Sequence, residues 1–339
     1  MNNSGLIIVL AYPDTIVRLA DEWYSFILRF FGIGKKNYIR AGHAALVLID
    51  KDTEILEYYD FGRYITAQST GRVRGKDTDH ELDFSIKPQI VDGKIKNIEE
   101  LLTFFATHPK LIHGEGKLVA SVCDVIDYQK AKDYISMMQQ RHFIRYGIFS
   151  KNATNCSRFV TSTLIASVTN ENIKKQLIKV TRFTPSTVAN VVIANTGNCV
   201  YEVSDKGEIS KFKSSVRKEI TRCFLDRLKT YEPTLIGNQH PIAIEGVHKK
   251  AQWLGGVGAG AWFELHETDN ETEYNYRKIA PCGSINVNDV FVVNDVAFNY
   301  KEDFNFVHYS NCKFFHIKQN DIVFRFDRKV ASYTNLIIK

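Results

Sequence analysis

The sequence predicts an α+β fold in which a first half of mixed helices and strands precedes a β-rich C-terminal region. Up to about residue 170, apolar runs of strand length alternate with longer runs whose apolar residues recur at helical spacing. The last 100 residues hold 16 aromatic residues, mostly in short runs separated by Asn, Asp and Gly, which is typical of strands. These observations place one domain at residues 1–180 and a β-rich accessory domain at residues 181–339, with a weaker sub-boundary near residue 240.

The first elements follow from the apolar pattern. Residues 6–12 predict a strand, and residues 13–15 predict the start of a helix whose apolar spacing continues to Phe31. Residues 44–49 and 55–61 are apolar or aromatic runs joined by a polar turn of hairpin length, so they predict an antiparallel hairpin.

The middle of the chain alternates between the two kinds of element. The polar residues 64–80 predict a loop, and residues 82–91 predict another strand. A strand at residues 117–125 is predicted between helices at residues 98–107 and 128–141.

Four further segments follow a loop at residues 147–154 and the helical pattern that begins after it. Residues 188–194 and 199–203 predict strands, residues 217–228 predict a helix, and residues 233–241 predict a linker.

Residues 21–34 carry large apolar side chains at helical spacing, namely Trp23, Phe26, Ile27, Phe30 and Phe31. The segment is too short to span a bilayer, and Arg29 interrupts it. We therefore expect a packed amphipathic helix and no stable insertion into a membrane.

Composition and charge exclude several classes of protein. With 44% apolar and 24% charged residues, the 339-residue chain can bury a core, which excludes disordered and low-complexity proteins. The net charge of +6 is a mild excess spread along the chain, so we expect no nucleic-acid partner. The six cysteines are far apart and form no CxxC pair, which argues against a zinc knuckle or a disulfide framework. A reducing compartment and a cytoplasmic location fit this pattern, and no export signal is visible.

Cys156 lies where the first turn of a helix is predicted, with Thr154 or Asn155 as its cap. At that position, unpaired backbone N–H groups and the positive end of the helix dipole stabilise a thiolate and could stabilise an oxyanion. Buried structural cysteines are common, so the alternative is an inert thiol.

A nucleophilic cysteine needs a base, and His43 is the strongest candidate among ten histidines. It follows Gly42 and opens the strand predicted at residues 44–49, so its imidazole would lie at a rigid strand end. From there it could face the first turn of a helix packed across the sheet. The alternative is a half-buried histidine that simply bonds to a neighbour.

A third group should orient the imidazole, and the partner strand of the hairpin supplies Glu57 and Asp60. Because they are three positions apart, they face opposite sides of a regular strand and only one can serve. We slightly favour Glu57, since an inward glutamate is otherwise costly to bury, whereas Asp60 could be an ordinary strand-end residue.

The order and flanks of these segments resemble the circularly permuted papain-like, NlpC-type (YiiX-like) cysteine hydrolases. In that superfamily a Gly-His pair opens an apolar strand, a paired strand carries a polar third residue, and an Asn-Cys-Ser segment opens the nucleophile helix. The matching segments here are residues 42–48, 55–57 and 155–160. The resemblance spans about residues 5–170.

The resemblance implies an antiparallel sheet with packed helices, Cys156 as nucleophile, His43 as base, and thioester chemistry on an amide or ester. Residues 58–64 are more elaborate than the usual strand of the family, so the orienting carboxylate, Glu57 or Asp60, stays open. That run is also similar to bacterial proteins of unknown function.

Three arginines, Arg63, Arg72 and Arg74, lie in or beside the loop after the orienting strand. A guanidinium binds a carboxylate or phosphate at two points, so these residues are candidates for contact with an anionic group of the substrate. The alternative is that they are solvated.

An acidic cluster follows the arginines and consists of Asp77, Asp79, His80, Glu81 and Asp83. It lacks the central glycine and final glutamate of a calcium loop. We interpret it as a solvated loop that could pair with the arginines, and we expect no metal and no cofactor.

Together these features predict a cysteine-dependent hydrolase, an amidase or peptidase, that acts on a small amide, peptide or acyl substrate. Transfer of the acyl group to an amine or alcohol would make it an acyltransferase. The alternative is a non-catalytic ligand- or glycan-binding protein with a papain-like cleft, in which the tryptophans of the β-rich second half could bind a sugar.

Overall fold

A computed structural model describes most of the chain. The described residues are 3–18, 24–35, 38–65, 70–147, 152–182, 184–197, 199–231, 241, 243–255, 260–280, 283, 285–308, 310 and 312–329.

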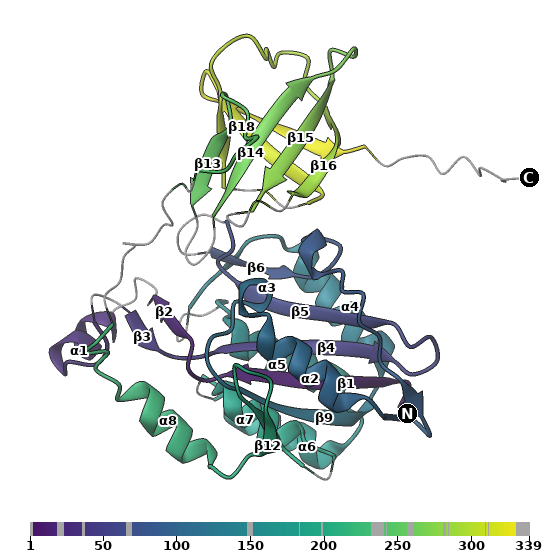
Figure 1. Ribbon diagram of the computed structural model, residues 1–339, viewed down its shortest axis with the longest axis vertical. Helices are drawn as coiled ribbons and strands as arrows, with labels where there is room; N and C mark the ends of the chain where they lie inside the picture. The colour runs from purple at the N-terminus through teal and green to yellow at the C-terminus, as the bar shows by residue number, and fades with distance from the viewer. Residues whose placement is uncertain are drawn as a thin grey trace, which may run out of the picture.

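The first part of the chain is built on an eight-stranded sheet, antiparallel throughout, in the order β10-β6-β5-β4-β1-β9-β11-β12 (Figure 1). Its strands are β1 (Gly5–Tyr12), β4 (His43–Asp50), β5 (Leu56–Gly62), β6 (Thr70–Arg74), β9 (Leu118–Ile126), β10 (Ile144–Arg145), β11 (Tyr201–Val203) and β12 (Ile209–Lys211). Every residue of β1 is buried, as its unbroken apolar run predicts for a strand covered on both faces.

Helices cover both faces of this sheet. One face carries α4 (Tyr128–Gln140), α5 (Cys156–Ser167), α6 (Glu171–Val180) and α7 (Thr187–Ala194), and the other carries α2 (Ile98–Thr107) and α3 (Pro109–Ile112). The sequence of strand β4 explains why both faces of the sheet are covered. Ala44 and Leu46 belong to the core with α5, whereas Ala45 and Val47 belong to the core with α2, because alternate side chains point to opposite faces.

A second, seven-stranded antiparallel sheet follows, in the order β13-β14-β15-β16-β19-β18-β17, and lies on the side of the first sheet where β6 is found (Figure 1). Its strands are β13 (Gln252–Gly255), β14 (Gly260–Glu267), β15 (Glu273–Ile279), β16 (Ile285–Val293), β17 (Asn305–Val307), β18 (Phe314–Gln319) and β19 (Ile322–Arg328). The sheet curls around stacked aromatic rings, among them Tyr276 and Phe315 with centroids 4.1 Å apart. Its two edge strands meet through the Gln252 side chain, which accepts from the Phe306 N–H at 2.8 Å and donates to the Phe304 carbonyl at 2.7 Å.

Shorter elements connect these parts. They are β2 (Ile16–Arg18), α1 (Tyr24–Phe30), β3 (Tyr38–Arg40), the 3-10 turn η1 (His80–Leu82), β7 (Ile90–Val91), β8 (Lys94–Ile95) and α8 (Val216–Phe224). Strands β2 and β3 pair with each other, as do β7 and β8.

The predicted mixture of helices and antiparallel strands with a β-rich C-terminal region is confirmed. The hairpin is present as β4 and β5, with Ala45 opposite Asp60. The boundary near residue 180 is not where the first sheet ends, because β11 pairs with β9 and β12 pairs with β11. The sub-boundary near residue 240 and most of the predicted linker lie outside the described residues.

Some local predictions were wrong. Residues 13–15 form a turn before β2 rather than a helix start, with Thr15 donating to the Tyr12 carbonyl. Residues 188–194 form helix α7 rather than a strand, because the Ser186 side chain caps the helix by accepting from the Ala189 N–H. Residues 64–80 include strand β6, and within 82–91 only β7 is a strand.

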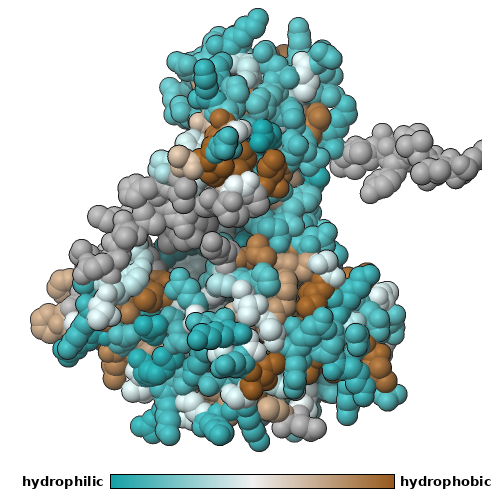
Figure 2. Space-filling view, viewed as in Figure 1, coloured by the Kyte–Doolittle hydropathy of each residue, from teal (hydrophilic) through white to brown (hydrophobic). Residues whose placement is uncertain are grey.

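Helix α1 is not packed as expected. Phe26, Phe30 and Phe31 are 69, 77 and 64% exposed. Figure 2 shows hydrophobic surface at this position, at the lower left of the molecule. In the described part of the chain, no helix combines the length and apolar character needed to cross a bilayer.

Candidate active site

His43 opens β4 and is held at the end of the first sheet. Gly42 before it has a φ of +76°, and a Cβ there would lie 3.1 Å from the Tyr12 carbonyl oxygen, so the chain reaches His43 through a turn that favours glycine. His43 lies opposite Tyr12 of β1, and their rings stack with centroids 6.3 Å apart. The imidazole is buried, with 6% of the residue exposed.

Cys156 is the first residue of α5, as the sequence predicts. The Asn155 side chain caps the helix by accepting from the Arg158 N–H at 2.9 Å, and it donates to the Gly147 carbonyl at 3.2 Å. Helix α5 packs on β4 and β5, which brings its first turn to the sheet that carries His43. The thiol is buried, with 7% of the residue exposed.

The structure brings His43 and Cys156 together. Burial by itself lowers the pKa of His43, but hydrogen bonds to Asp60 and Cys156, together with the charges of both partners, outweigh burial and raise that pKa from 6.5 to about 9. The surroundings therefore favour the protonated imidazolium form of His43.

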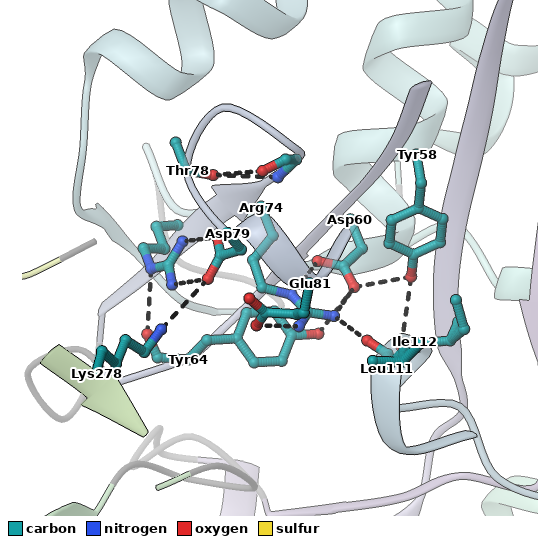
Figure 3. Close-up of polar contacts among 12 residues, drawn as sticks. Tyr58, Asp60, Tyr64, Arg74, Thr78, Asp79, Glu81, Leu111, Ile112 and Lys278 are labelled. Carbon is teal, nitrogen blue, oxygen red and sulfur yellow. Dashed lines mark hydrogen bonds and ion pairs between the residues drawn. The ribbon is translucent and has the colours of Figure 1, made fainter. Parts of the chain in front are cut away.

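Asp60 is the carboxylate on His43. His43 Nε2 lies 3.3 Å from Asp60 Oδ2, and Asp60 is fully buried. The hydroxyls of Tyr58 and Tyr64 donate to the same oxygen at 2.9 and 3.2 Å, and Arg74 donates to both carboxylate oxygens at 3.1 and 2.7 Å (Figure 3). Burial raises the pKa of Asp60, but the Arg74 charge and the hydrogen bonds from His43 and Arg74 hold it well below its usual range.

The preference for Glu57 as the orienting residue is corrected. Glu57 faces the opposite side of β5, where it accepts from Lys132 at 2.6 Å and from the Tyr128 hydroxyl at 3.0 Å. Lys76 is also within 3.3 Å of it. The strand alternation that limited the choice to one carboxylate therefore selects Asp60.

Arg72 and Arg74 are buried, with 3 and 1% exposed. Arg72 binds both oxygens of Asp79, and Arg74 binds both oxygens of Asp60. This placement corrects the expectation that they contact a substrate, because each guanidinium is occupied by a carboxylate inside the protein.

Arg63 lies over the Tyr146 ring at 4.7 Å, and its contact with a substrate stays a prediction. The interpretation of the acidic cluster as a solvated loop was wrong for Asp79, which is 1% exposed. Among the residues that the structure describes, no group of three or more His, Cys, Asp or Glu side chains is placed to hold a metal ion.

Sequence reasoning missed the two tyrosines on Asp60. Tyr58 lies two positions before Asp60 on β5 and therefore shares its face, so strand alternation could have found it. Tyr64 follows the end of β5, and its place depends on the turn beyond the strand.

The sequence also gave no sign of the contacts that Asn190 makes from α7. Its amide donates to the Ser157 carbonyl at 2.9 Å and to the Ser157 hydroxyl at 3.0 Å. It therefore holds the residue that follows Cys156.

Two family models match separate ranges of the chain. A family model described as Type VI secretion system effector TseH-like matches residues 7–173, and a model of the DUF6695 C-terminal domain matches residues 251–329. The crystal structure of the Type VI secretion system effector TseH is 18% identical, covers 62% of this chain and 98% of that chain, and gives a TM-score of 0.41. No curated protein matches the chain. Residues 7–173, which include His43, Asp60 and Cys156, are thus similar to TseH-like effectors.

Proposed function

We propose that this chain is a cysteine-dependent hydrolase of the papain-like kind, in which Cys156 is the nucleophile, His43 the base and Asp60 the orienting carboxylate. The observation that carries the proposal is the buried His43 ring, whose Nε2 lies 3.3 Å from Asp60 Oδ2 and whose pKa is raised by both Asp60 and Cys156. A nucleophile, a base and an orienting group in contact are the arrangement that covalent acyl transfer requires.

In the proposed first step, the Cys156 sulfur attacks the carbonyl carbon of an amide or ester. The carbon–sulfur bond forms, and His43 passes a proton to the leaving amine or alcohol as the carbon–nitrogen or carbon–oxygen bond breaks. In the second step, His43 takes a proton from water, which attacks the thioester, releases the carboxylic acid and restores the thiol. An amine or alcohol in place of water would give acyl transfer.

The start of α5 would stabilise the negative charge that develops on the carbonyl oxygen. Backbone N–H groups in a first helical turn have no partner within the helix, and they point toward the helix start where Cys156 lies. The Asn190 contacts on Ser157 and the Asn155 cap hold this turn in place. Their effect would be to fix these donors before the reaction begins.

The range that is similar to TseH-like effectors, residues 7–173, contains all three proposed catalytic residues, His43, Asp60 and Cys156. The similarity is therefore compatible with the proposal. The class of bond attacked comes from the resemblance of the flanking segments to papain-like hydrolases. We extend the proposal to a peptide or small amide as substrate.

The experiment that tests the proposal measures alkylation of Cys156 by iodoacetamide against pH, followed by peptide mass spectrometry. We expect rapid labelling well below pH 8.5, the pKa of a free thiol, and slower labelling in His43→Ala. Cys312 and Cys123 provide internal controls, because burial raises the pKa of each to about 12. A His108→Ala variant is the matched control, since His108 is an exposed histidine outside the site.

Labelling of Cys156 no faster than a free thiol, and unchanged in His43→Ala, would contradict the proposal and favour a non-catalytic binding protein. A second measurement uses p-nitrophenyl acetate as the substrate. A stoichiometric burst of p-nitrophenol followed by continued release, both lost in Cys156→Ala, is expected of an enzyme that forms and hydrolyses a thioester, whereas a merely reactive thiol gives one equivalent and stops.

A further inference from the structure

The second sheet touches the first close to the proposed catalytic carboxylate. Lys278 of β15 is 5% exposed, and its Nζ lies 3.8 Å from Asp79 Oδ1 in the turn after β6 (Figure 3). In the same turn, the Thr78 carbonyl accepts from the Cys312 N–H at 2.9 Å. A lysine with so little exposure needs a charged partner, and Asp79 supplies it.

Asp79 also binds Arg72 of β6, the strand that carries Arg74. Arg72 donates to the two oxygens of Asp79 at 2.5 and 2.6 Å. Burial raises the pKa of Asp79, but Arg72 and Lys278 outweigh burial and hold it well below its usual range. The carboxylate is therefore charged, and it binds a cation from each sheet.

Arg72 in turn fixes Tyr64. Its Nε donates to the Tyr64 carbonyl at 3.2 Å, and the Tyr64 hydroxyl donates to Asp60 at 3.2 Å. The Arg74 guanidinium lies 4.0 Å above the Tyr64 ring. Tyr64 thus connects the Arg72–Asp79 pair with the carboxylate on His43.

Ile65, the residue after Tyr64, packs in the second sheet. Ile65 is 4% exposed and belongs to the aromatic core of that sheet, although Tyr64 belongs to the site in the first. Ile65 has a φ of +45°, a conformation that a β-branched residue adopts only when its surroundings compel it. Two adjacent residues are therefore anchored in different sheets.

We propose that Lys278, Asp79 and Arg72 are positioning residues through which the second sheet holds Tyr64, and thereby Asp60, against His43. The inference rests on the proposed function and adds a regulatory property to the same site: displacement of the second sheet would loosen the orienting carboxylate. The C-terminal region is then part of the site's framework and not a detachable recognition module.

The test is a titration of the His43 ring by NMR in the full-length protein, compared between the parent and Lys278→Met. Asp60 on β5, Cys156 on α5 and Tyr12 on β1 face this ring, and Arg74 and His113 act on the same cluster. If Asp60 moves away, its contribution to His43 weakens. We expect the titration midpoint of His43 to fall from about 9 by about one pH unit.

Lys318→Met is the matched control, because Lys318 lies on β18 of the same sheet, is half exposed and pairs with Asp321 outside the network. Its His43 midpoint should equal that of the parent. Tyr64→Phe removes only the hydroxyl from Asp60 and keeps the buried ring, so it serves even if Lys278→Met does not fold. If the hydroxyl positions Asp60, the midpoint should fall; a rise would show that the hydroxyl only competes with His43 for Asp60 Oδ2, and would overturn the inference.

An unchanged His43 midpoint in a folded Lys278→Met protein would overturn the inference, and so would an unchanged midpoint in Tyr64→Phe. Failure of the proposed function has a different signature: slow, His43-independent labelling of Cys156 in the parent. The titration reports the position of Asp60 whether or not the thiol reacts, so the two failures remain distinguishable.

Discussion

The two faces of β5 carry two buried carboxylates in different surroundings. Asp60 lies among two tyrosines, a buried arginine and His43, whereas Glu57 lies among two partly exposed lysines and a tyrosine. Both carboxylates have a lowered pKa, yet only Asp60 contacts a group that could react. The comparison shows that an offset of three positions along a strand is enough to separate a site residue from a structural ion pair.

The difference between the two faces of β5 can be tested by comparing Asp60→Asn with Glu57→Gln. We expect the largest effects from Asp60→Asn. Asp60→Asn leaves Arg74 without its buried counter-charge and should lower the free energy of unfolding by about 3 kcal/mol. It should also slow alkylation of Cys156 near pH 7 by roughly tenfold, because His43 loses the charge that favours its protonated form. Urea denaturation and labelling rates measure the two effects.

Glu57→Gln should cost about 1 kcal/mol, since its lysine partners are 26 and 31% exposed and water already screens them. Its labelling rate should stay close to that of the parent. Equal losses of labelling in the two variants would show that the faces of β5 do not differ in function.

A second prediction concerns pH. Because the pKa of His43 is raised from 6.5 to about 9, its contribution to stability is fully present below pH 6.5 and is lost as the pH rises to about 9. Over that interval the parent should lose up to about 3 kcal/mol relative to His43→Gln. Urea denaturation of both proteins at several pH values measures this difference.

The carboxylates behave in the opposite sense. The lowered pKa of Asp60 gives stability that is present above its unfolded value, about 3.9, and is lost only as the pH falls below it. A parent protein that loses no more stability than His43→Gln between pH 6.5 and 9 would show that His43 is not held as an imidazolium.

The smallest effects are expected from removing one hydroxyl on each face. Tyr58→Phe takes a buried donor from Asp60 and should cost about 1.5 kcal/mol, with a measurable shift of the His43 titration midpoint. Tyr128→Phe takes a partly exposed donor from Glu57 and should cost about 0.5 kcal/mol, with no change at His43. A shift at His43 in Tyr128→Phe would contradict the separation of the two faces.

Local pattern predicted much of the site. The apolar alternation of β4 and β5 gave the hairpin, and the Asn-Cys-Ser start of α5 placed Cys156 at a helix tip, because both depend on residues close together in the chain. The choice between Glu57 and Asp60 depended on the register of β4 and β5: Ala45 lies opposite Asp60, and His43, two positions before Ala45, shares its face.

Other features depend on tertiary contacts that composition does not reveal. The guanidinium groups of Arg72 and Arg74 are buried only because Asp79 and Asp60 lie opposite them. Helix α7 has a β-branched sequence that suggests a strand, but its Ser186 cap and its packing against β1 and β9 override that preference. The phenylalanines of α1 have the spacing of an amphipathic helix, which predicts that they are buried. They are exposed because no other part of the described chain covers them.

The Gln252 side chain has a consequence for how copies of this protein can meet. Where β13 and β17 approach, its amide occupies a backbone N–H and a backbone carbonyl of the opposite edge, so this seam cannot accept a strand from another molecule. Aggregation by edge-to-edge pairing is thereby blocked at that seam, and any assembly formed there would have to rely on side-chain surfaces.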